Sequence, residues 1–131
     1  ALGEAWTVAK KSNLDLKKTY QGIAVSSGNS FVHETESQVI LNGSYNINFT
    51  MDLVVKDTSL FDNLSKKLNS NLELSPIISD IFKDGEKKYG KRAWSSMIVK
   101  RMEDKNNIEF RAKGFPAELT DNEPEEKGFE I

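Results

Sequence analysis

The sequence predicts an α+β fold, in which a mostly antiparallel β-sheet carries a mid-chain helical pair packed on one face. Three observations lead to this expectation. Residues 44–53, SYNINFTMDL, alternate apolar and polar side chains without interruption, as a half-buried strand requires. Asn42-Gly43 stands directly before them, and this dipeptide is typical of tight hairpin turns. After residue 56 the apolar spacing changes to the three-and-four pattern of a helix.

Length and composition indicate one folded unit. A chain of 131 residues with seven Phe, three Tyr and two Trp can fill one core. We expect a single α+β domain over residues 1–115 and an acidic tail over 116–131. The net charge of −2 excludes a global attraction to nucleic acid or to anionic membranes. The absence of Cys excludes disulfides and thiolate metal sites, and no apolar run approaches the ~18 residues of a membrane span.

The first predicted hairpin pairs residues 31–41, FVHETESQVIL, with residues 44–53. A three-residue loop with Gly43 in a left-handed bulge keeps the carboxylates of the first strand in water. This register places His33 opposite Met51, on the inner face of the sheet.

The remaining elements follow from spacing and turn residues. Residues 2–9 fit either a helix or a strand start, and residues 14–25 read as a strand. Helices are expected near 60–70 and from Pro76 to Gly85, because a capping Ser precedes each of them. Residues 92–102 and 108–113 have strand character and are expected to close the sheet as a second hairpin.

No catalytic signature is present in the sequence. It contains one histidine, His33, and no Gly-rich phosphate loop, nucleophile elbow or zinc-protease motif. In a strand, the neighbouring carboxylates would point away from His33, so an acid/base pair is not formed there. The sequence therefore predicts no catalytic residue, no metal site, no cofactor and no enzyme activity.

A basic run over residues 87–101, KKYGKRAWSSMIVKR, mixes cations with aromatic rings, a composition that suits single-stranded nucleic acid or another anionic partner. Strand alternation would disperse these charges, and the acidic tail could neutralise them, so nucleic acid is not the preferred partner. We expect the apolar end of the tail to be ordered, either on this basic segment or on a neighbouring chain. The predicted partner-binding residues are Lys87, Lys88, Tyr89, Lys91, Arg92, Trp94, Phe129 and Ile131.

By elimination, the sequence predicts a non-catalytic binding or structural assembly module, such as an exported bacterial protein, the soluble domain of a lipoprotein or a virion component. The expected partner is another protein or a second copy of the chain. Two alternatives stay open: a carrier of a small apolar ligand between sheet and helices, and a binder of single-stranded nucleic acid through residues 87–101. An exported, periplasmic or virion location is preferred, with the compartment left unassigned.

Overall fold

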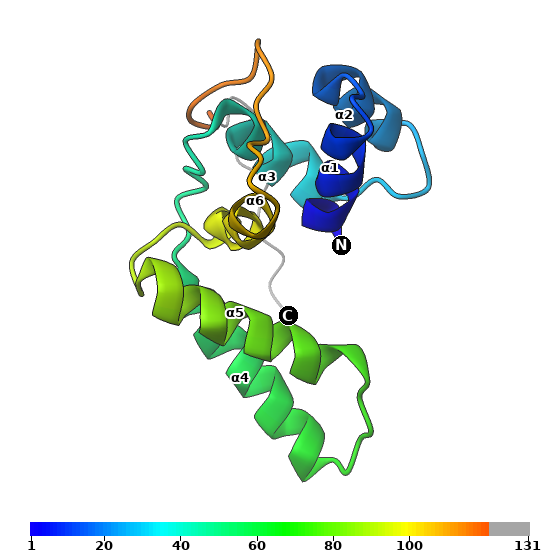
Figure 1. The fold of residues 1–131 in the computed structure, drawn as a ribbon. Coiled ribbons are helices and arrows are strands. Elements are labelled where there is room, and N and C mark those ends of the chain that lie inside the picture. Colours follow the sequence, from blue (N-terminus) through cyan, green and yellow to red (C-terminus); the bar gives the residue numbers. More distant parts are fainter. Residues whose placement is uncertain (121–131) are drawn as a thin grey trace, which may run out of the picture.

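The computed structural model describes residues 1–120, and most of these residues are helical. Figure 1 shows an upper group of short helices and, below it, a long helical hairpin. The elements in order are α1 (Leu2–Lys11), α2 (Leu16–Ala24), α3 (Phe31–Asn42), α4 (Met51–Lys67), α5 (Leu74–Tyr89), the 3-10 helix η1 (Ser95–Val99) and α6 (Lys100–Asn106).

The predicted α+β fold is wrong. Within residues 1–120 no strand forms, and the one β-type pairing is an isolated bridge between Thr50 and Trp94. The mid-chain helical pair exists as α4 and α5, but it packs beside η1 and not on a sheet. The structure of residues 1–120 also contains no helix with the length and apolarity needed to cross a membrane.

The segment predicted as the first strand is helix α3. Ser30 caps it, since its Oγ accepts a hydrogen bond from the backbone N–H of His33 at 3.1 Å. Gly43 ends it in the left-handed conformation, with a φ of 94°. A hairpin turn and a helix C-terminus both use a glycine with positive φ. The Asn42-Gly43 dipeptide therefore marks the end of helix α3 and not a hairpin turn.

The alternating segment 44–53 is also not a strand. Tyr45 and Asn48 both have a φ of 56°, which lies in the left-handed region and breaks an extended chain. The chain is irregular up to Thr50, and α4 begins at Met51. Tyr45 and Met51 are nevertheless buried, whereas Phe49 is 38% exposed, so only some apolar positions of the pattern mark core contacts.

The other predicted strands also differ. Residues 16–24 form α2, which begins where the side chain of Asp15 accepts a hydrogen bond from the N–H of Lys18. Residues 2–11 adopt the helical alternative. The predicted closing hairpin is absent, because residues 95–106 form η1 and α6, and residues 108–112 have no regular secondary structure.

The core lies between α1, α2, α3, η1 and residues 108–112. Trp6, Leu41 and Phe110 are fully buried at its centre. Around them pack Ala9, Leu16, Ile40, Tyr45 and Val99.

Residues 108–117, which we call the C-terminal strap, cross α3 and its C-terminus. The N–H of Ala112 donates to the carbonyl of Leu41 at 3.0 Å. The side chains of Asn42 and Ser44 then donate to the carbonyls of Phe115 and Ala117, at 2.9 and 2.6 Å. The strap, which lies near the C-terminal end of the described residues, therefore covers the core at the C-terminus of α3.

Candidate functional site

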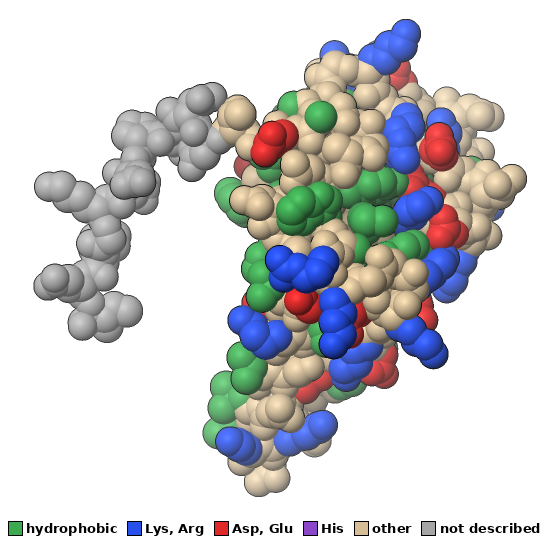
Figure 2. Space-filling model, turned by 90° about the vertical axis from the view of Figure 1, so that its left-hand side faces the viewer, with side chains coloured by type: hydrophobic (Ala, Val, Ile, Leu, Met, Phe, Trp, Pro, Cys, Tyr) green, Lys and Arg blue, Asp and Glu red, His purple; other side chains and the backbone are tan. Residues whose placement is uncertain are grey.

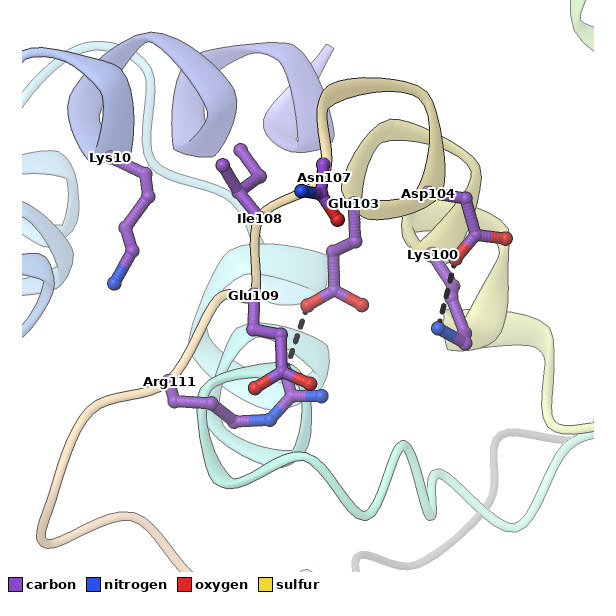
Figure 3. Close-up of a pocket in the computed structure, with 8 residues that line it drawn as sticks. All are labelled: Lys10, Lys100, Glu103, Asp104, Asn107, Ile108, Glu109 and Arg111. Atoms are coloured by element: carbon purple, nitrogen blue, oxygen red, sulfur yellow. Dashed lines mark hydrogen bonds and ion pairs between the residues drawn. The ribbon is translucent and has the colours of Figure 1, made fainter.

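A polar hollow lies between α1, α6 and the start of the C-terminal strap (Figure 3). Its volume is about 480 Å³. The side chains that line it are Lys10, Lys100, Glu103, Asp104, Asn107, Ile108, Glu109 and Arg111.

Glu103 is the buried charge of this pocket, with only 2% of its surface exposed. Its Oε1 accepts from the backbone N–H of Phe110 at 2.7 Å and from Nη1 of Arg111 at 2.8 Å. Its second oxygen accepts from the hydroxyl of Tyr45. A buried carboxylate is tolerated when a cation and several donors surround it, so Glu103 is a compensated structural charge.

Tyr45 and Arg111 complete this network. Burial, reinforced by the hydrogen bond to Glu103, raises the pKa of the Tyr45 hydroxyl well above its ordinary value. The hydroxyl therefore stays protonated and acts as a donor to Glu103 at physiological pH. Nη2 of Arg111 donates to the same hydroxyl at 3.0 Å, and the guanidinium lies 5.4 Å from the centre of the Tyr45 ring.

Asp104 binds three donors on the rim. Lys88, Lys100 and Tyr89 donate to its carboxylate at 2.6, 2.9 and 2.8 Å. These hydrogen bonds hold the pKa of Asp104 well below its usual range. Asp104 is consequently an anchor that ties α5 to α6, and it is not poised to exchange a proton near neutral pH.

The pocket as a whole is electrically balanced. Lys10, Lys100 and Arg111 bring positive charge, while Glu103, Asp104 and Glu109 bring negative charge. A phosphate-binding site needs an excess of cations or free N–H donors. This geometry supports polar contacts with a neutral or zwitterionic group, and it does not supply the charge for a pyrophosphate.

His33 is buried but does not face a strand partner. One of its ring nitrogens, Nδ1, lies 3.1 Å from Oγ of Ser37, and Nε2 lies 3.0 Å from the carbonyl of Tyr20. Its ring also packs on those of Trp6 and Tyr20, with centroids 5.9 and 4.6 Å away. Both nitrogens are thus occupied inside the core, so the predicted pairing with Met51 is wrong while the interior location is correct.

The predicted partner-binding residues are divided by the structure. Lys88 and Tyr89 are engaged with Asp104, and Arg92 lies 3.4 Å from the carboxylate of Asp52. Trp94 packs partly into the core. Lys87 and Lys91 are exposed, and Phe129 and Ile131 lie outside the described residues. A shared binding role for this set stays a prediction.

A second, larger hollow is apolar. It has a volume of about 710 Å³ and runs between α5, the first turn of α1 and the η1–α6 segment. Ile77, Ile78 and Phe82 of α5 face it, as does Glu36 of α3. Burial raises the pKa of the Glu36 carboxyl, since ionisation beside apolar side chains is disfavoured.

Replacing Glu36 with Gln is therefore expected to stabilise the chain near neutral pH. The raised pKa means that the folded state holds its proton more tightly than the unfolded state, so ionisation of Glu36 above its folded pKa costs stability. The gain from Glu36→Gln should be present at pH 7 and should vanish below about pH 4, where the carboxyl is protonated in both states. Urea unfolding of both proteins across this range measures it, with the exposed Glu109→Gln as control. A gain that persists unchanged at low pH would contradict this explanation.

The described helices form a domain of a dehydrogenase family, as the comparison with known families shows. The family model described as "NAD-binding of NADP-dependent 3-hydroxyisobutyrate dehydrogenase" matches residues 1–102, and the chain belongs to this family. It is also similar to L-threonate dehydrogenase of Haemophilus influenzae, with 28% identity over 96 residues, and to that of Escherichia coli, with 27%. Each match covers 72% of this chain and 32% of the relative, so the chain spans about a third of their length.

The family overturns the functional interpretation of the sequence. A non-catalytic binding or structural assembly module, such as a virion component, was expected, with an apolar-ligand carrier and a nucleic-acid binder as alternatives, whereas the family and the named relatives point to an oxidoreductase. The expectation of no enzyme is wrong for the same reason. Sequence reasoning missed this because residues 1–102 contain no glycine-rich phosphate loop, the feature by which nucleotide-binding domains are usually found.

Proposed function

We propose that this helical domain is part of an NAD(P)-dependent oxidoreductase that acts on a small hydroxy acid. The observation that carries the proposal is the family match over residues 1–102. The names of the family and of the relatives support the substrate class, because 3-hydroxyisobutyrate and L-threonate are both small carboxylates with an alcohol group. A bound nicotinamide would supply a hydride acceptor for oxidation of such an alcohol to a carbonyl.

The described residues do not form a complete dinucleotide site. The polar pocket is charge-balanced, with Arg111 bound to Glu103 and Lys100 bound to Asp104. A pyrophosphate is usually held by a glycine-rich turn and the free N–H groups of a helix N-terminus. No reaction step through the cofactor is assigned to these side chains for that reason.

The role proposed for this domain is to form one rigid helical side of a substrate site, which we call the wall. Glu103, Tyr45 and Arg111 join α6, the chain after α3 and the C-terminal strap through buried hydrogen bonds. Networks of this kind fix the relative positions of the elements that they connect. In an enzyme, a fixed wall limits the positions that a bound substrate can take.

The proposal predicts cofactor reduction by the product of the complete reading frame. With L-threonate or 3-hydroxyisobutyrate and either NAD⁺ or NADP⁺, the absorbance of the reduced nicotinamide should appear. D-threonate serves as a stereochemical control and should react more slowly. The 131-residue chain alone should show no turnover. Absence of cofactor reduction with a panel of small hydroxy acids would overturn the proposed activity, and turnover by the 131-residue chain would overturn its role as a wall.

A further inference from the structure

Two opposite charges of the polar pocket have no partner among residues 1–120. Lys10 of α1 and Glu109 of the C-terminal strap line the hollow, and neither side chain forms a hydrogen bond or an ion pair with another described residue. Both side chains are open to solvent. Figure 3 shows that they extend in the same direction from their backbones, so one small molecule in the pocket can contact both.

The remaining charges of the pocket are already paired. Arg111 contacts Glu103 at 2.8 Å, and Lys100 contacts Asp104 at 2.9 Å. Asp104 also binds Lys88 at 2.6 Å. The pocket therefore offers one positive and one negative charge to a ligand, beside pairs that are already neutralised.

Two further side chains complete the lining. Asn107 ends α6 in the left-handed conformation, with a φ of 51°, and its side-chain amide can both donate and accept hydrogen bonds. Ile108, the next residue, supplies an apolar surface. The volume of about 480 Å³ lies in the range of small-molecule pockets.

The charges of the protein disfavour other classes of ligand. Figure 2 shows Lys and Arg side chains next to Asp and Glu side chains on one face of the molecule, and the net charge is only −2. Long-range attraction therefore selects neither anions nor cations strongly. In the part of the chain that the structure describes, no group of three or more His, Cys, Asp or Glu side chains could hold a metal ion.

We propose that the polar pocket binds an amino acid, with the ligand carboxylate on Lys10 and the ligand ammonium group on Glu109. A ligand with both charges neutralises both unpaired side chains, whereas an anion or a cation alone leaves one of them without a partner. The site is separate from the proposed oxidation of a hydroxy acid, because a hydroxy acid has no ammonium group for Glu109. Failure of one proposal therefore leaves the other standing.

Calorimetric titration of the 131-residue chain tests the proposal. Glycine, β-alanine, γ-aminobutyrate and ε-aminocaproate carry the two charges at increasing separation, and at least one of them should bind with a Kd of about 1 mM or below. The carboxylic acid and the amine of the same length carry one charge each and should bind at least about fivefold more weakly. L-threonate should also bind more weakly, because it lacks the ammonium group.

Two substitutions identify the two contacts separately. Lys10→Met should weaken binding of the amino acid at least about fivefold and leave the affinity for the amine unchanged. Glu109→Gln should weaken binding of the amino acid to the same extent and leave the affinity for the carboxylic acid unchanged. This crossed pattern distinguishes two charge contacts from a general disturbance of the pocket.

Matched controls remove the same charges outside the pocket. Lys11→Met and Glu118→Gln alter exposed side chains and should leave every Kd unchanged, and circular dichroism verifies that each variant keeps its helix content. Absence of binding by all four amino acids would overturn the proposal. Equal affinity for L-threonate and for the amino acid would also overturn it. Loss of the acid, the amine and the amino acid together in either pocket variant would contradict the assignment of the two contacts.

Discussion

Replacing Arg111 with Met is expected to lower the free energy of unfolding by about 3 to 5 kcal/mol, the usual result of removing one partner from a buried ion pair. Glu103, which is 2% exposed, would keep only the donors from Tyr45 and Phe110 and would lose its cation. The Arg111 side chain is about one-third exposed. Removing it therefore recovers only a small desolvation cost, which offsets little of the lost stability. Urea unfolding at neutral pH measures the change.

An exposed arginine provides the control for this experiment. Arg92 also pairs with a carboxylate, Asp52, at 3.4 Å, but its side chain is 77% exposed. Arg92→Met should therefore cost about 0 to 1 kcal/mol. Equal losses from the two substitutions would show that burial of Glu103 does not control the stability of this network.

Replacing Trp6 with Ala is expected to lower the free energy of unfolding by about 3 to 5 kcal/mol, because the substitution leaves a cavity at the centre of the core. Trp6 is fully buried, and its ring stacks on that of His33. Its indole N–H has no acceptor among the described residues. Trp6→Phe should thus cost much less, since it removes an unpaired donor and keeps most of the apolar contact.

Val8 on the same helix is the matched control for Trp6. It is 65% exposed, so Val8→Ala should change stability by less than about 0.5 kcal/mol. Thermal unfolding of Trp6→Ala, Trp6→Phe and Val8→Ala measures the relative loss of stability in the three variants. A small loss for Trp6→Ala would mean that the helices close around the vacated volume, and the assignment of Trp6 as the centre of the core would fail.

The sequence predicts burial better than backbone conformation in this protein. His33 and Met51 were placed inside and are inside. The alternation over residues 44–53 cannot reveal that Tyr45 and Asn48 adopt positive φ, since tertiary contacts hold them there. Strand propensity reflects the packing of a residue more than its own backbone preference, and here the packing is between helices.

The signals at Ser30 and Gly43 were present but ambiguous. A serine before an apolar residue and a glycine thirteen residues later are typical of a helix start and stop, yet Asn42-Gly43 was assigned to a hairpin. The polar pocket was not predictable, because it joins Lys10, Glu103 and Arg111, which are far apart in the chain. The family was missed because its match contains no short motif with a recognisable mechanism.

The C-terminal strap has a consequence for the protein while it is being synthesised. Asn42 and Ser44 each bind a carbonyl 73 residues further along the chain, and Phe110 fills the core from the same late segment. At translation rates of roughly 5 to 20 residues per second, these partners are synthesised about 4 to 15 seconds after α3. During that interval Trp6, Leu41 and Tyr45 lack their cover, so a nascent chain exposes the same apolar surface that the finished domain hides.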